Sequence, residues 1–126
     1  LPMGDEKLAG IAAEDIGKCA LGMFKRGTEL AGKTIGLAGE QLTGDEMAKK
    51  YSKLLGRPVR YNAVPFDIFR GLGFPAAQEL GNMFQFYTEF AEDVGKKRDV
   101  AFSRELNPEL KDFDEWLSRN RAKISV

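Results

Sequence analysis

One stretch of the sequence combines aromatic, thioether and amide side chains at helical spacing and could line a ligand pocket. Such pockets are mostly apolar, with a few polar groups that orient the ligand, and Asn82 and Tyr87 would supply them. Packing in an ordinary core is the commoner explanation of aromatic residues at this spacing. The two polar residues suit a core least, because a buried polar tip needs a partner. The expected pocket wall is Phe74, Asn82, Met83, Phe84, Phe86 and Tyr87.

Other chemistry is restricted by the residue types present. The chain contains no histidine and one cysteine, so it lacks the commonest general base and zinc ligand. A Ser–His or Cys–His nucleophile pair cannot form within it, and we expect neither a catalytic residue nor a metal site. Cys19 is better explained as a small core residue than as a redox switch. Asp15 is better explained as a helix N-terminal carboxylate or a hinge contact than as a catalytic acid.

Glycines at positions 32, 36 and 39 raise the question of a phosphate-binding loop. Such a loop places its glycines at a strand-to-helix turn, with helix amides aimed at the phosphates. Here the glycines lie within and beside a predicted strand, so tight strand packing explains them better. We expect no cofactor-binding residue in this chain.

Residues 1–64 predict alternating helices and strands. The apolar spacing over Ala13–Lys25 indicates an amphipathic helix. Thr43 and Glu46 fit a capping box that opens a second helix, which Gly56 ends. Alternation and β-branched residues predict strands at Lys33–Ala38 and Val59–Val64. The expected buried face of the first helix is Ile16, Cys19, Ala20, Met23 and Phe24.

Residues 65–126 are expected to be mainly helical. Pro65 opens a short helix that Gly73 ends, and Pro75 opens a longer one that runs to about Ala91. The longer helix is apolar on two faces, one with Leu80, Met83, Phe84 and Tyr87 and the other with Phe86 and Phe90. Further along, we expect a polar loop at Asp93–Arg98, an extended Asp99–Leu106, and a last helix capped by Asp112 and anchored by Phe113, Trp116 and Leu117.

Length and charge limit the class of protein. The chain has 126 residues, enough for one compact domain, and its 19 basic and 19 acidic residues are scattered. A nucleic-acid or membrane-surface module would need a basic stripe, so we expect neither kind of partner. A single cysteine fits a reducing, intracellular compartment.

The predicted sheet looks unfinished. Two or three strands would leave unpaired edges and an uncovered apolar face, so we expect them to extend a larger sheet. The chain begins at Leu1 without an initiator Met, and we interpret it as the C-terminal part of a longer polypeptide. The expected fold class is α/β.

The sequence resembles the C-terminal portion of NmrA-like proteins, atypical members of the short-chain dehydrogenase/reductase group, and is most similar to their redox-sensor branch. Each matching block is short, but the blocks follow one another in the expected order across nearly the whole chain. They are Leu1-Pro2-Met3-Gly4-Asp5, Glu14-Asp15-Ile16-Gly17, Gly32-Lys33-Thr34-Ile35-Gly36-Leu37, Leu72-Gly73-Phe74-Pro75-Ala76-Ala77, Asn82-Met83-Phe84-Gln85-Phe86-Tyr87, Leu106-Asn107-Pro108 and Trp116-Leu117.

The resemblance implies an N-terminal Rossmann domain that binds NADP(H), absent from this chain, and a C-terminal substrate-domain-like part spanning residues 1–126. Residues 1–64 would add helix and strand units to a larger sheet, and the aromatic wall would face the cofactor cleft. It further implies a non-catalytic redox sensor, cytoplasmic or also nuclear, that signals through regulatory protein partners. A homodimer and a small-molecule ligand in the inter-domain cleft are compatible with it. The alternative is an NADPH-dependent oxidoreductase of quinones or small carbonyl compounds, so whether the parent protein is an enzyme stays open.

Overall fold

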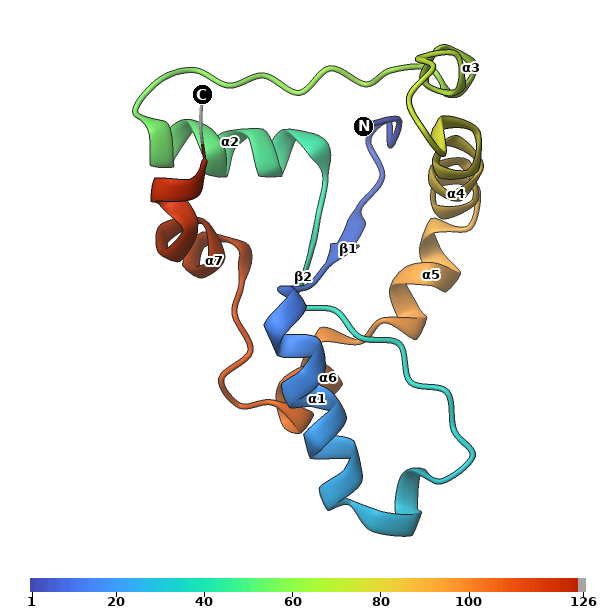
Figure 1. Cartoon of the computed structure of the whole chain (residues 1–126), viewed down its shortest axis with the longest axis vertical. Helices are drawn as coiled ribbons and strands as arrows, with labels where there is room; N and C mark the ends of the chain where they lie inside the picture. Colours follow the sequence, from blue (N-terminus) through green and yellow to red (C-terminus); the bar gives the residue numbers. More distant parts are fainter. Residues whose placement is uncertain (125–126) are drawn as a thin grey trace. The chain divides into compact units, whose positions relative to one another are not determined.

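The computed structural model describes residues 1–124 and has the expected α/β class, with helices predominating (Figure 1). Strands β1 (Leu8–Gly10) and β2 (Glu40–Leu42) pair in a two-stranded sheet. The helices are α1 (Ala13–Lys25), α2 (Gly44–Leu55), α3 (Phe66–Arg70), α4 (Ala77–Glu89), α5 (Ala91–Lys97), α6 (Val100–Leu106) and α7 (Phe113–Asn120). Short 3-10 helices occupy Gly27–Leu30 and Arg121–Lys123.

The chain forms two compact units, each built from two separate segments. The first unit comprises Leu1–Leu8 and Leu42–Gly95. Its core consists of Met3, Phe69 and Phe84, against which Leu8, Val64, Leu80, Met83 and Tyr87 pack. Tyr61 holds the N-terminal segment, because its hydroxyl donates to the Leu1 carbonyl at 2.8 Å and accepts from the Met3 amide at 3.1 Å.

The second unit comprises Ala9–Gln41 and the chain from Lys96 onward. Its core is Cys19, Leu30, Leu106 and Leu110, with Ile11, Met23, Ile35, Leu37, Val100 and Phe102 packed around them. Helices α1 and α6 lie against each other in this unit. The residues of this core come from both ends of the unit, so its stability depends on contacts far apart in sequence.

Helix ends follow the predicted capping signals. Thr43 accepts a hydrogen bond from the Glu46 amide at 3.1 Å, and the Glu46 carboxylate accepts one from the Thr43 amide at 2.8 Å. Gly56 ends α2 in the left-handed conformation, with φ of 66°. Asp112 and Glu115 form a second capping box at the start of α7. The expected helices at these positions are confirmed.

Both predicted strands are wrong. Lys33–Ala38 and Val59–Val64 contain no strand, and the two strands lie elsewhere. The Ala38 amide donates to the Ser103 hydroxyl at 3.1 Å, and the amide and carbonyl of Val59 bond to the Ser52 hydroxyl. Side chains therefore satisfy these backbone groups in place of a neighbouring strand. Gly36 permits a close backbone approach, since a Cβ there would lie 2.2 Å from the Lys97 carbonyl oxygen.

The segment after α4 is also helical where a loop and an extended stretch were expected. Helix α5 spans most of the predicted Asp93–Arg98 loop, and α6 replaces the predicted extended segment. Asp99 caps α6, because its carboxylate accepts from the Ala101 amide at 2.8 Å and the Phe102 amide at 3.3 Å. An aspartate at this position is a helix-start signal, so the start of α6 has a local sign in the sequence.

The buried faces of two helices differ in part from expectation. In α1, Cys19 is fully buried, but Ile16 and Phe24 are 47% and 81% exposed. The buried stripe instead includes Asp15, four residues before Cys19 and so on the same face of the helix. In α7, Leu117 is the buried anchor at 1% exposed, whereas Trp116 is only partly buried.

Close packing of α1 on α6 predicts a specific cost for adding one methyl group. A Cβ at Gly22 would lie 2.1 Å from the Leu106 carbonyl oxygen, so Gly22→Ala must push the two helices apart. Overpacking of this kind costs about 1–3 kcal/mol, and thermal unfolding should show the loss. Gly17→Ala is the matched control, because the same helix has open space there and alanine is the better helix former. Equal melting temperatures for the two variants would contradict this packing.

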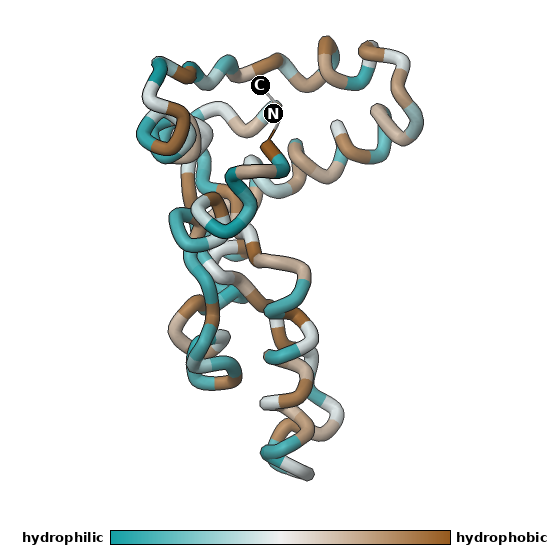
Figure 2. Tube along the Cα trace, turned by 60° about the vertical axis from the view of Figure 1, so that its left-hand side comes forward, coloured by the Kyte–Doolittle hydropathy of each residue, from teal (hydrophilic) through white to brown (hydrophobic). Residues whose placement is uncertain are grey.

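Over the described residues, none of the helices is long and apolar enough to span a membrane. Figure 2 shows hydrophobic and hydrophilic residues interspersed along the trace.

Candidate functional site

Helix α4 has two apolar faces, as the sequence predicted, and one of them belongs to the core of the first unit. Phe84 is 7% exposed, and its ring lies edge-on to Phe69 with centroids 5.6 Å apart. Met83 and Tyr87 pack at the edge of the same cluster. These three members of the expected pocket wall therefore support the core of the unit.

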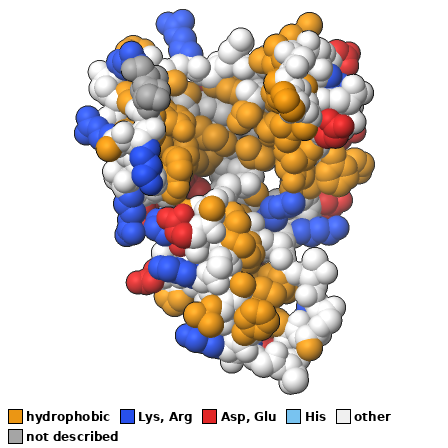
Figure 3. Space-filling model, viewed as in Figure 1, with side chains coloured by type: hydrophobic (Ala, Val, Ile, Leu, Met, Phe, Trp, Pro, Cys, Tyr) orange, Lys and Arg blue, Asp and Glu red, His pale blue; other side chains and the backbone are white. Residues whose placement is uncertain are grey.

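The other face of α4 lies at the surface. Phe86 is 52% exposed, Phe90 is 48% exposed, and their ring centroids are 4.9 Å apart. Phe74, before α4, is 37% exposed and packs edge-on against Phe69 at 5.5 Å. In Figure 3, hydrophobic side chains gather over α3 and α4 at the right of the view, with acidic and basic side chains beside them. Phe74 and Phe86 are thus the aromatic members of the expected wall that present surface.

Asn82 is held by Arg70, which joins α3 to α4. The Arg70 side chain donates from Nε to the Asn82 Oδ1 at 2.9 Å and from Nη1 to the Asp67 carboxylate at 3.0 Å. Its Nη2 also bonds to the Gln85 amide oxygen. The Asn82 oxygen is therefore already an acceptor for a protein group.

The same arginine explains a small residue in the middle of α4. A Cβ at Gly81 would lie 2.6 Å from the Arg70 Cγ, so the stem of Arg70 lies across the helix backbone. Arg70 is 19% exposed, and its guanidinium stands 6.0 Å from the centre of the Phe66 ring. The arrangement fixes α3 on α4 and keeps the exposed aromatic face in a defined position.

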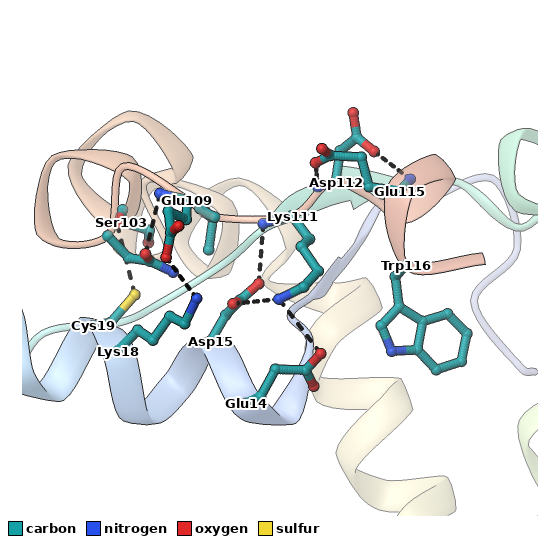
Figure 4. A network of polar contacts seen from close by, with 12 residues as sticks. Glu14, Asp15, Lys18, Cys19, Ser103, Glu109, Lys111, Asp112, Glu115 and Trp116 are labelled. Carbon is teal, nitrogen blue, oxygen red and sulfur yellow. Dashed lines mark hydrogen bonds and ion pairs between the residues drawn. The ribbon is translucent and has the colours of Figure 1, made fainter. Parts of the chain in front are cut away.

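The second unit contains a buried ion pair between α1 and the segment before α7 (Figure 4). Asp15 is fully buried and accepts two hydrogen bonds from Lys111, one from Nζ at 2.7 Å and one from the backbone amide at 3.0 Å. Lys111 is 6% exposed, and its Nζ also lies 3.4 Å from the Glu14 carboxylate. This pairing places Asp15 in a structural role at the first turn of α1, as the sequence favoured.

The pair keeps both of its members charged. Burial alone raises the pKa of the Asp15 carboxyl, but the hydrogen bonds and charge of Lys111 outweigh it, so that the pKa lies below its ordinary value. The hydrogen bond to Asp15 in turn raises the pKa of the Lys111 ammonium more than burial lowers it. Neither group is set to exchange a proton near neutral pH, which argues against an acid–base role.

Cys19 lies one turn along α1 and is a core residue, as expected. It is fully buried, and its thiol contacts the Ser103 carbonyl oxygen at 3.6 Å. Burial, with a smaller contribution from the Asp15 charge, raises the pKa of the thiol. A thiol of this kind is a poor nucleophile.

The glycines between residues 32 and 39 serve close packing. A Cβ at Gly39 would lie 2.8 Å from the Lys111 carbonyl oxygen, and Gly36 is similarly close to Lys97. Residues 33–38 lead to strand β2 and no helix begins among them. The expectation of tight packing holds, although the packing does not occur within a strand.

Comparison with known proteins decides the family. The model of the NmrA-like family matches residues 1–117. The chain belongs to the NmrA-like family. Three solved structures of NmrA, a negative transcriptional regulator, share the fold of this NmrA-like chain: an NADP complex (23% identity, TM-score 0.65), an NAD complex (21%, 0.66) and a monoclinic form (20%, 0.67).

The matches cover most of this NmrA-like chain and less than half of each NmrA chain. They span 87%, 94% and 96% of this chain, in the order above, but 38%, 43% and 43% of the NmrA chains. The chain therefore spans about two fifths of the length of these relatives. At this identity the likeness establishes the fold.

Sequence reasoning missed Arg70 and Lys111, the two cations that organise these sites. Arg70 meets Asn82 and Gln85, and Lys111 meets Asp15 across 96 residues. A lone arginine or lysine in a mixed-charge sequence carries no local sign of such pairing. The one indirect signal was Asn82 itself, a polar residue on a helix rich in aromatic residues.

Proposed function

We propose that this chain is the C-terminal part of a regulator that responds to NADP(H) and acts through protein partners, without catalysis of its own. The observation that carries the proposal is family membership over residues 1–117. Solved relatives of the same fold are described as a negative transcriptional regulator in complex with NADP or NAD. The chain would supply the part that closes over the nucleotide and transmits its presence.

The nucleotide would be held mainly by polypeptide outside this chain. A dinucleotide phosphate site needs glycines at a strand-to-helix turn, and the glycine-rich residues 32–39 pack against backbone instead. Residues 1–64 would join the sheet of the nucleotide-binding half, and residues 65–126 would form the mainly helical substrate-domain-like part.

In this proposal the residues of the expected pocket wall have two different roles. Met83, Phe84 and Tyr87 would shape the wall from behind, since they pack in the core of the first unit. Phe74, Asn82 and Phe86 would meet a ligand or partner directly. Arg70 would position the wall, because it ties α3 to Asn82 and Gln85 on α4.

The isolated chain should bind NADPH only weakly. Without a phosphate loop, binding would rely on apolar contact alone, and we expect a dissociation constant weaker than about 1 mM, or an affinity below roughly 4 kcal/mol. Isothermal titration calorimetry with NADPH and NADP⁺ tests this directly. Micromolar binding by the 126-residue chain would overturn the assignment of the nucleotide site to the rest of the protein.

The full-length protein decides between a regulator and a reductase. NADPH absorbance is followed over time with a panel of quinones and small carbonyl compounds. Tight NADPH binding without turnover supports the regulator. Sustained, acceptor-dependent loss of NADPH would replace it with the alternative, an NADPH-dependent oxidoreductase that uses the aromatic wall for its substrate.

A further inference from the structure

The surface of α4 carries two large aromatic side chains that the core of its unit does not use. Phe86 and Phe90 are about half exposed, and their rings lie beside each other at a tilt of 34°. They follow Glu79 at i+7 and i+11, a spacing that places all three along one face of a helix. Exposed aromatic residues that cluster in this way mark interaction surfaces more often than scattered ones do.

The surroundings of this aromatic pair are acidic. The part of the first unit from residue 66 to its end at Gly95 holds five acidic residues and one basic residue, and the basic Lys96 and Lys97 follow in the last turn of α5. The one basic residue, Arg70, is already bonded to Asp67, Asn82 and Gln85. The acidic residues are Asp67, Glu79, Glu89, Glu92 and Asp93. Within the first unit, this segment therefore carries a net negative charge on the elements that hold the aromatic pair.

We propose that this aromatic, acidic face of α4 docks a basic amphipathic segment of a partner protein. Apolar side chains of the segment would pack on Phe86 and Phe90, while its Lys or Arg residues would lie near Glu79 and Glu89. Cations gain further attraction over the exposed aromatic rings. The proposal deepens the proposed function, on which it rests, by naming the chemistry of the regulator's partner.

Charge disfavours three other occupants of this face, namely a second copy, an anionic lipid surface and a nucleic acid. A second copy that docked through the same face would place acidic residues opposite acidic residues, because a two-fold contact pairs a surface with itself. An anionic lipid surface or a nucleic acid would be repelled in the same way. A basic amphipathic segment is the occupant that satisfies both the apolar centre and the acidic rim.

The test uses two synthetic peptides of roughly 16 residues, long enough for several helical turns. One has leucines on one helical face and lysines on the other, and its matched partner has glutamates in place of the lysines. Fluorescence anisotropy of each labelled peptide with the full chain gives the two affinities, and NMR shift changes locate the contact. We expect the basic peptide to bind at least about tenfold more tightly, and less tightly at about 0.5 M salt.

Variants distinguish docking on α4 from nonspecific binding to exposed aromatic residues. Phe86→Ala with Phe90→Ala should weaken the basic peptide about tenfold or more. Glu79→Lys with Glu89→Lys should reverse the preference between the two peptides. Phe24→Ala is the control, because Phe24 is an even more exposed aromatic residue, on α1 in the other unit. Circular dichroism confirms that each variant keeps its helices.

Equal binding of the two peptides, or an equal loss with Phe24→Ala, would overturn the proposal. No nucleotide enters the assay, so this failure is distinct from failure of the proposed function. If the full-length protein binds NADPH without turnover but its α4 face does not bind the basic peptide, the proposed regulatory function stands and the docking proposal is wrong. If the peptide binds and the full-length protein oxidises NADPH in an acceptor-dependent way, the docking site stands and the regulatory function is wrong.

Discussion

Replacing Asp15 by Ala is expected to lower the free energy of unfolding of the second unit by about 3–5 kcal/mol, the usual cost of leaving one member of a buried ion pair without its partner. Asp15 is fully buried, and it accepts hydrogen bonds from both the Lys111 ammonium and the Lys111 backbone amide. Loss of the Asp15 carboxylate would leave the buried Lys111 ammonium without its nearest acceptor and the Lys111 amide without a hydrogen-bond partner. Urea unfolding followed by the fluorescence of Trp116, the single tryptophan, reports on this unit.

Glu14→Ala is the matched control for this prediction. Glu14 lies next to Asp15 and also faces Lys111, at 3.4 Å, but its side chain is 54% exposed. Ion pairs that water can reach contribute little, so this variant should unfold close to the wild type. If the two alanine variants lost the same stability, the burial of Asp15 would not be the cause.

The pH dependence of unfolding gives a second view of the same pair. The folded state lowers the pKa of Asp15, so its contribution is complete above the unfolded value of about 3.9 and disappears as the pH falls through the lower folded value. The folded state raises the pKa of Lys111, so that contribution is complete below about 10.4 and disappears at higher pH. Asp15→Asn should flatten the acid limb. An unchanged acid limb would show that other carboxylates set it.

Features fixed by a few neighbouring residues could be predicted from the sequence. The capping boxes at Thr43 and Asp112 depend on a residue and its third successor, so they are readable without knowledge of the rest of the fold. Strands were not predictable in this way. An alternating segment such as Val59–Val64 becomes a strand only if a neighbour pairs with it, and here the Ser52 hydroxyl bonds to Val59 instead.

The candidate site was predictable in its pattern and not in its orientation. Periodicity identified both apolar faces of α4, but the packing of Phe69 and Met3 from elsewhere in the unit decides that Phe84 faces inward and Phe86 outward. In α1 the same limit produced an error. From sequence alone, a carboxylate is expected to be exposed. Asp15 takes the place of Ile16 on the buried face because Lys111, distant in sequence, pairs with it.

Phe84→Ala is the second variant with a large expected effect. Phe84 is 7% exposed and packs with Phe69 and Met3, and removal of a buried phenylalanine ring costs about 3–5 kcal/mol. Because Trp116 lies in the other unit, the measurement is amide hydrogen exchange in α3 and α4, where protection should fall. The change should leave exchange in α1 and α6 nearly unaltered if each unit holds its own core.

Phe86→Ala, two residues along the same helix, is the comparison that gives this result its functional meaning. Phe86 is about half exposed, so the variant should change protection in α4 by no more than about 0.5 kcal/mol, the range of ordinary surface substitutions. A stable Phe86 variant that binds ligand or peptide poorly would assign the residue to recognition. If Phe86→Ala instead lowered the protection of α4 as much as Phe84→Ala, both apolar faces would serve the stability of the helix. The proposal that the surface of α4 is a binding site would then be wrong.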